Sequence, residues 1–348
     1  MTDRDYVDLM NSTIVRSHES ASRPLLRVGG RVLSRLAPAT AARVAARLFL
    51  TPPRHRRPAA EVALLERAHA RPLFVGGRRL EMWKWGRGPA VLLVHGWGGR
   101  GTQLGAFVEP LVARGFSVVT FDAPGHGVAE PGLVTIPEMT AALRAVAATQ
   151  RPLTGLIAHS VGATVATRAL YEGLHADSVV LVAPAAELVS PAAAFAKALG
   201  LSRRVAELMR ERIEQRVGKP WSAFDVATLA PALSAPLLVV HDREDGEVPW
   251  QHGRLVAHSW AGPADVLETQ GLGHRRVLRD PGVIAAAVAF IAWAAGYDEI
   301  LDAPERSRKL HEQWLAALPC PVVRITDAGG AGEHAEVVLC ALAPRGSL

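Results

Sequence analysis

The chain has 348 residues, of which 49% are hydrophobic and 21% charged, a composition ordinary for a soluble globular protein with one large α/β domain or two smaller ones. Its only cysteines, Cys320 and Cys340, stand near the end, which argues against a disulfide framework and favours a reducing, cytoplasmic location. The net charge of +6 is a local feature, because residues 21–60 contain nine arginines and no acid. No nucleic-acid-binding motif accompanies these arginines, so we expect no nucleic-acid partner.

Residues 1–71 are predicted to form a helical extension. Residues 1–20 carry several acids and lack the apolar region of a secretory signal. Arginines then recur at every fourth position and would line one side of a helix: Arg23, Arg27, Arg31 and Arg35. Gly29-Gly30 weaken this helix and Pro38 ends it, so residues 21–60 are expected to present a solvated arginine face on helices packed over the core. The alternative is contact of this segment with an anionic membrane surface or an acidic partner. Two more helices are expected at Thr40–Leu48 and Glu61–Ala70.

Residues 72–298 alternate between apolar strands and helical stretches. After a hairpin over 73–85, the expected strands are 90–95, 116–121, 153–158, 178–182, 236–241 and 264–269, and the expected helices are 104–114, 136–150, 161–174 and 283–295. This alternation predicts a mostly parallel, doubly wound α/β sheet covered on both faces. No run is long enough to span a bilayer.

Two segments lie outside this alternation. Residues 184–235 are longer than a strand-to-helix connection needs, and they contain a helical stretch from Ser202 to Val217, so we interpret them as a small helical lid. The alternative interpretation is that residues 184–235 form a solvent-facing insertion. Residues 299–348 form a C-terminal extension of unassigned role, with a possible helix at Glu305–Leu318 and possible strands at Pro321–Ile325 and Glu336–Leu342.

Ser160 stands where a buried strand gives way to a helix. The small residues Ala158 and Gly162 flank it at two positions on either side and leave room for a sharp turn with positive φ. This layout is typical of a nucleophile elbow, which holds a serine hydroxyl above a sheet. The alternative is a plain helix N-cap.

Four further motifs stand where strands are expected to end. They are His95-Gly-Trp-Gly-Gly99, Asp122-Ala-Pro-Gly-His-Gly127, the acidic stretch His241–Pro249 and Gly271-Leu-Gly-His274. The glycines of the first motif allow a backbone amide to approach a developing oxyanion. Along the chain, a serine, an acid and a histidine therefore follow one another as Ser160, Asp245 and His274.

From about Pro72 to Ala295, these motifs resemble the α/β-hydrolase superfamily, in particular its esterase, lipase and proline-iminopeptidase branch. The resemblance implies that Ser160 is the nucleophile, His274 the general base and Asp245 the acid that orients it. It also implies that the backbone N–H groups of Val161 and Trp97 bind the oxyanion. The implied activity is hydrolysis of a carboxylic ester, thioester or amide through an acyl-enzyme.

Several alternatives remain open at this point. Asp242 competes with Asp245 for the acid role, although the spacing to Val248-Pro249 favours Asp245 and leaves Asp242 as a loop cap. His159 is interpreted as a pocket or core residue, and His95 and His126 as loop-holding residues. Arg275-Arg276 are interpreted as a solvated pair rather than an attractor for an anionic substrate.

At the level of function, the alternatives are a binding protein on a hydrolase scaffold, and a carbon–carbon bond hydrolase or acyltransferase. We expect a small ester or acyl substrate, no cofactor and no metal. This follows from the lack of a dinucleotide or phosphate-loop motif and of zinc-type spacing. Oligomeric state has no sequence signal.

Overall fold

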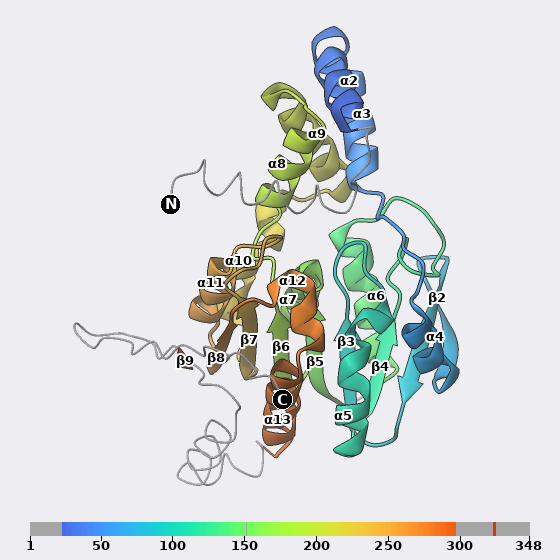
Figure 1. Cartoon of the computed structure of the whole chain (residues 1–348), viewed down its shortest axis with the longest axis vertical. Coiled ribbons are helices and arrows are strands. Elements are labelled where there is room, and N and C mark those ends of the chain that lie inside the picture. Colours follow the sequence, from blue (N-terminus) through green and yellow to red (C-terminus); the bar gives the residue numbers. More distant parts are fainter. Residues whose placement is uncertain (1–22, 151, 297–322, 325–348) are drawn as a thin grey trace, which may run out of the picture.

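A computed structural model describes residues 23–150, 152–296 and 323–324, and the fold is described for these residues only (Figure 1). They build one nine-stranded sheet in the order β1-β2-β4-β3-β5-β6-β7-β8-β9. The strands are β1 His69–Val75, β2 Arg78–Trp85, β3 Ala90–Val94, β4 Ser117–Phe121, β5 Leu153–His159, β6 Ser178–Val182, β7 Leu237–Asp242, β8 Ala264–Thr269 and β9 Val323–Arg324.

The sheet is parallel from β4 through β8, and antiparallel only where β1, β2 and β9 join it. Every residue of β3, β4, β5, β6, β7 and β8 is buried, because helices cover both faces. The expected parallel sheet and the hairpin at its edge are therefore confirmed. The predicted boundary at residue 71 falls inside β1, which pairs with β2 from His69 onward.

Two helical layers form the two halves of the core. One face of the sheet packs against α6 Ile136–Ala148, α7 Val161–Tyr171 and α11 Gln251–Ser259. The other packs against α4 Ala59–Glu66, α5 Val108–Ala113 and α13 Pro281–Ala294. The short helices α10 Val226–Leu229 and α12 Gly273–Arg276 lie in the connections.

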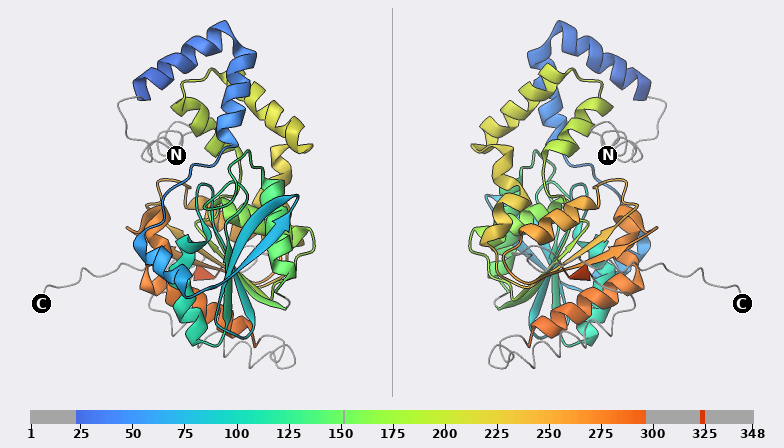
Figure 2. Two further views of the ribbon diagram at one scale, coloured as in Figure 1. Left: turned by 90° about the vertical axis from the view of Figure 1, so that its right-hand side faces the viewer. Right: turned by 90° about the vertical axis from the view of Figure 1, so that its left-hand side faces the viewer.

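A helical cap stands beyond the carboxyl edge of the sheet (Figures 1 and 2). One half of the cap comes from the 184–235 segment, called the insertion below, and consists of α8 Val189–Ala198 and α9 Arg203–Val217. The other half is N-terminal and consists of α2 Arg23–Leu36 and α3 Pro38–Phe49. The two halves share apolar clusters in which alanines of α3 meet Val205, Met209 and Ile213 of α9. The N-terminal helices thus pack on the insertion, and the two segments make one structure.

Three local predictions need correction. The expected helix 104–114 is a 3₁₀ turn at Gly101–Phe107 followed by α5, with a kink at Leu104. Helix α8 was not predicted, since only Ser202–Val217 was expected to be helical in this segment. Helix α2 continues through Gly29-Gly30 without a break. A Cβ atom on Gly30 would lie 1.9 Å from the Leu199 carbonyl oxygen, so the close packing of α2 requires glycine at this position.

Of the elements predicted in the C-terminal extension, only one falls on described residues. The strand expected at Pro321–Ile325 corresponds to β9, while Glu305–Leu318 and Glu336–Leu342 lie outside the described residues. In the described part, no single helix has the length and apolar character of a transmembrane span; helical residues Gly273–Arg279 and Pro281–Ala294 meet that test only together, across a 63° bend.

Candidate active site

Ser160 occupies the sharp turn between β5 and α7. Its φ of 55° is positive, a conformation shared with Ala183 alone among the described non-glycine residues. Its amide donates to the Val182 carbonyl oxygen at 3.0 Å, which ties the turn to the neighbouring strand. A Cβ atom on Gly162 would lie 2.6 Å from the His95 carbonyl oxygen, so the helix can start this close to the β3 loop only with glycine there. The strained turn predicted from the sequence is present.

The loop after β3 runs directly against Ser160. A Cβ atom on Gly96 would lie 2.9 Å from Ser160 Cβ, and Trp97 follows Gly96 in the chain. His95 holds this loop: its Nδ1–H donates to the Gly96 carbonyl oxygen at 2.8 Å, and its Nε2 accepts from the Ala123 amide at 3.0 Å. The loop backbone is therefore fixed beside the serine.

His126 also holds a loop rather than facing Ser160. Its Nδ1–H donates to the Pro124 carbonyl oxygen at 2.8 Å, and its ring packs edge-on against Trp97 at 5.2 Å. Burial, with the neighbouring His95 as a second cause, lowers the pKa of His126 to about 3. The neutral His126 ring therefore packs against Trp97 and helps to fix the loop after β3.

Asp245 and His274 form a buried pair. His274 Nδ1 donates to Asp245 Oδ2 at 2.7 Å, and the other carboxylate oxygen accepts from the amides of Glu247 at 2.7 Å and Val248 at 2.9 Å. His241 Nε2 lies 3.3 Å from Oδ2 on the other side. These contacts leave the Asp245 carboxylate fixed and His274 Nε2 free of Asp245.

Asp242 is engaged elsewhere. Its carboxylate accepts from the Glu244 and Leu272 amides and from the Thr269 hydroxyl, at 2.8–3.0 Å. It therefore ties the loop after β7 to the loop after β8. Of the two candidate acids, the structure pairs Asp245 with His274.

The protonation equilibria of the pair follow from its surroundings. Burial alone would raise the pKa of Asp245, but hydrogen bonds from His241 and His274 hold it well below its usual range. Burial alone would lower the pKa of His274, but the hydrogen bond and charge of Asp245, helped by Glu247, raise it above its ordinary value of 6.5. An ionised acid thus faces a more basic imidazole.

His159 links the elbow to the pair. Its ring centroid lies 4.6 Å from that of His274, and its Nε2–H donates to the His274 carbonyl oxygen at 3.0 Å. Burial and the nearby charge of His274 hold the pKa of His159 well below its usual value. Ser160, the next residue, is therefore brought to the side of His274, but within the described residues no hydrogen bond joins the Ser160 hydroxyl to the His274 ring.

One carboxylate close to His274 was not predicted from the sequence. Glu247 Oε2 lies 3.9 Å from His274 Nε2, while its Oε1 pairs with Arg275 Nε at 2.9 Å. Arg276 is used differently, since it donates to the Leu272 carbonyl oxygen. No sequence spacing indicated Glu247, because folding alone brings His274, which lies in α12, close to it.

The chain between the cap and β1 also borders the site. Arg57 pairs with the buried Asp122 and donates to Thr102 Oγ1 at 2.7 Å. Glu61 makes a two-pronged ion pair with Arg100, at 2.5 and 2.6 Å. Residues 50–61 therefore clamp the loops that follow β3 and β4, which the sequence did not reveal.

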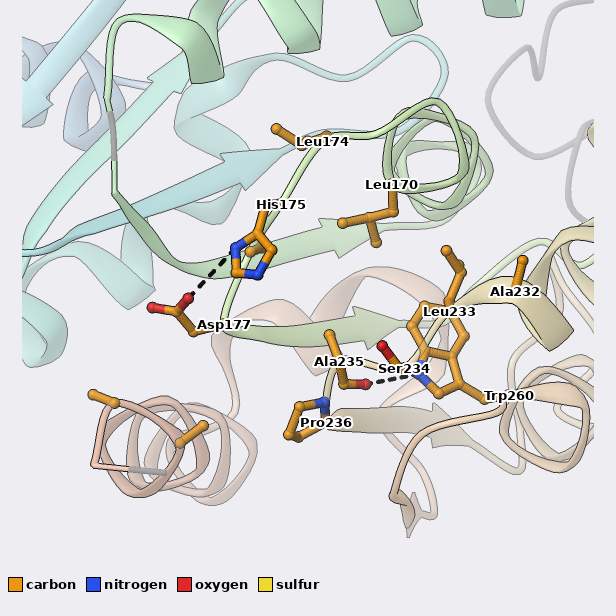
Figure 3. Close-up of a pocket in the computed structure, with 13 residues that line it drawn as sticks. Leu170, Leu174, His175, Asp177, Ala232, Leu233, Ser234, Ala235, Pro236 and Trp260 are labelled. Carbon is orange, nitrogen blue, oxygen red and sulfur yellow. Dashed lines mark hydrogen bonds and ion pairs between the residues drawn. The ribbon is translucent and has the colours of Figure 1, made fainter. Parts of the chain in front are cut away.

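A separate hollow of ≈ 360 Å³ lies at the other edge of the sheet (Figure 3). It is bordered by the amino ends of β6 and β7, where Trp260 Nε1 donates to the Ala235 carbonyl oxygen and His175 lies 3.6 Å from Asp177. Ser160 follows the carboxyl end of β5, which runs parallel to β6. The hollow is therefore remote from Ser160 and is not the candidate site.

Comparison with known proteins agrees with this architecture. A curated relative, the uncharacterized protein YqaC of Bacillus subtilis (strain 168), is 35% identical over 92 residues, which are 24% of this chain; the match spans only about half (50%) of YqaC's length. Two solved structures share the fold at low identity. A putative non-heme bromoperoxidase, BpoC of Mycobacterium tuberculosis H37Rv, has a TM-score of 0.50 at 22% identity, over 62% of this chain and 96% of its own. The mouse alpha/beta hydrolase domain-containing protein 10 has a TM-score of 0.50 at 19% identity, over 68% of this chain and 99% of its own.

The family model described as "Alpha/beta hydrolase family" matches residues 91–338, more than half of the chain. That range contains the elbow, the paired acid and histidine, and the loop motifs described above. The chain therefore belongs to the alpha/beta hydrolase family.

Proposed function

We propose that the protein is a serine hydrolase that cleaves a carboxylic ester of modest size through an acyl-enzyme on Ser160. The observation that carries the proposal is the buried Asp245–His274 hydrogen bond of 2.7 Å, set beside a serine on a strained strand-to-helix turn. Because Asp245 accepts the Nδ1 proton, Nε2 is the nitrogen left to accept a proton from the serine.

The reaction would proceed in two halves. Ser160 Oγ attacks the ester carbonyl carbon while His274 Nε2 takes its proton, and the tetrahedral intermediate then expels the alcohol, which receives that proton. A water molecule, deprotonated by the same nitrogen, attacks the acyl-enzyme and releases the carboxylic acid. Asp245 stays ionised and stabilises the imidazolium in both halves.

The oxyanion would be bound by the amides of Val161 and Trp97. Val161 is the first residue of α7, and first-turn amides lack a carbonyl partner within the helix and carry the positive end of its dipole. Trp97 lies on the loop that Gly96 brings against Ser160. Each oxyanion donor typically contributes about 10²–10³ in rate.

The contact between Ser160 Oγ and His274 Nε2 belongs to the substrate-bound state in this proposal. Such contacts are commonly long in free enzymes and shorten in the complex with substrate. The His159 and His274 rings pack with their centroids 4.6 Å apart, and this packing holds the turn that carries Ser160 next to His274.

Covalent labelling tests the proposal. A fluorophosphonate reacts with an activated serine, so the full chain should be labelled at neutral pH, and tryptic mass spectrometry should place the adduct on the peptide that contains Ser160. Pre-incubation with a turned-over ester should slow the labelling. A protein that fails to react, or that reacts at another serine, would contradict the assignment and favour a binding role for the fold.

The pH dependence is a second expectation. Only neutral His274 can accept the serine proton, so kcat/KM should rise with pH and reach half its plateau above pH 6.5, since the His274 pKa is raised from that value. Replacing Glu247 by glutamine removes one carboxylate that favours the imidazolium, and should move the midpoint to lower pH. The exposed Glu244→Gln variant is the matched control, and an equal shift in both would remove Glu247 from the explanation.

A further inference from the structure

The outer face of α2 and α3 carries a repeated pair of residues, an arginine followed by an aliphatic residue. The pairs are Arg27-Val28, Arg31-Val32, Arg35-Leu36, Arg43-Val44 and Arg47-Leu48. Successive pairs are four or eight residues apart, so each helix presents one row of arginines beside one row of aliphatic side chains. We call these ten residues the outer face of the cap.

The aliphatic row is exposed. Leu36 is 79% exposed, and Val28, Val32, Val44 and Leu48 are 45–54% exposed. With Leu26, α2 and α3 carry half of the large apolar side chains that are exposed in the described part of the chain, on a small fraction of its length. Such a concentration marks a contact surface rather than scattered exposure.

The helices cannot turn this row inward. On α2, Gly30 is pressed against the Leu199 carbonyl, and Ser34 Oγ accepts from the Ser202 amide at 3.2 Å. On α3, the opposite face is buried against α9 through alanines 41, 42, 45 and 46. The side of each helix that packs on the insertion is therefore opposite the exposed outer face, and the two helices lie at the far end of the cap (Figures 1 and 2).

Within the part of the chain that the structure describes, the positive charge of this face has no carboxylate partner. Arginines near the body of the protein have carboxylate partners, such as Arg57 with Asp122 and Arg100 with Glu61. Across the described residues, none of the five arginines of the outer face is ion-paired, and residues 21–60 contain no acid. A second copy of the same face would bring like charges together, so self-association through it is disfavoured.

We propose that the outer face of the cap docks on an anionic phospholipid bilayer, with α2 and α3 lying in the plane of the interface. Aliphatic side chains would enter the acyl boundary, while the arginines beside them reach the phosphates, which is the arrangement of interfacial amphipathic helices. The proposal does not depend on the proposed ester hydrolysis, because docking uses none of the residues around Ser160.

Sedimentation of the full chain with extruded vesicles tests the docking. The protein should sediment with phosphatidylcholine vesicles that contain phosphatidylglycerol, should stay in the supernatant with phosphatidylcholine alone, and should be released by salt. Arg31→Gln with Arg35→Gln should lower the partition coefficient about 25-fold, at about fivefold per arginine. Val32→Asp with Leu36→Asp should lower it at least about tenfold.

Matched controls lie outside the cap. Arg87→Gln with Arg114→Gln removes the same amount of charge from two exposed arginines near the amino ends of β3 and β4. This variant should lower the partition coefficient only slightly, through the smaller net charge of the protein. Phe74→Asp removes an exposed apolar side chain that is 70% accessible on β1. Equal losses in the controls and the cap variants would overturn the assignment to this face.

Other results would also overturn the proposal. Wild-type protein that stays in the supernatant with both vesicle types would favour an acidic protein partner. A dimer in light scattering that the cap variants abolish, without vesicle binding, would assign the face to self-association. A melting temperature lowered by more than about 5 °C in the Val32→Asp/Leu36→Asp variant would show that the row is packed within the chain itself.

Discussion

Replacing Ser160 by alanine should lower kcat/KM for a short chromogenic ester by about 10⁴–10⁶. The alanine variant loses the oxygen that forms the acyl-enzyme, while Asp245 and His274 keep their 2.7 Å hydrogen bond. The fold should be unaffected, because the Ser160 side chain makes no hydrogen bond to the backbone amides in the first turn of α7. Esterase assays and a thermal melt on the same preparation measure the two effects.

Ser259→Ala is the matched control, since it removes an exposed serine hydroxyl that bonds only the Leu255 carbonyl oxygen. Its kcat/KM should equal that of the wild type. A Ser160→Ala variant that retains the full rate would exclude the acyl-enzyme route, and a matched loss in both variants would indicate a general structural effect.

Replacing Arg57 by leucine should lower the free energy of unfolding by about 3–5 kcal/mol, because it leaves the Asp122 carboxylate buried without its counter-charge. That carboxylate is fully buried, with only the Gly101 and Val128 amides as further donors, at 2.8 and 2.7 Å. Arg57 also packs over the Trp83 ring at 5.0 Å. Urea denaturation followed by circular dichroism measures the loss.

Two variants separate the buried pair from a generic arginine effect. Arg56→Leu changes an exposed neighbour and should alter stability by no more than about 0.5 kcal/mol. Adding Asp122→Asn to Arg57→Leu removes the stranded charge and should restore part of the loss. If the double variant is no more stable than Arg57→Leu, the charge of Asp122 is not the cause.

Much of the core was predictable because its signals are local. Continuous apolar runs such as Ala90–Val94 mark strands that must be buried on both faces, and Ser160 between Ala158 and Gly162 marks a turn that tolerates no bulk. The spacing from Asp245 to Val248 also distinguished it from Asp242, and the hydrogen bonds of the two aspartates agree with that choice.

The remaining features depend on contacts between distant segments. Position 30 requires glycine because the Leu199 carbonyl passes close by, whereas propensity alone indicated only that glycine weakens the helix. Arg57 and Asp122 are 65 positions apart and are joined only by folding. Likewise, the arginines of α2 are visible in the sequence, but the exposure of the aliphatic row depends on which face α8 and α9 cover.

The shared cap has a consequence for the order in which the protein is made. Helices α2 and α3 leave the ribosome long before α9, the surface on which α3 packs, has been translated. Domains usually fold from the N-terminus as they emerge, but here α2 and α3 must wait for a partner that lies far downstream in the chain. The cap is therefore completed late in synthesis, and its arginine-rich N-terminal segment is available to chaperones or to a bilayer before the strands that precede Asp245 and His274 have been translated.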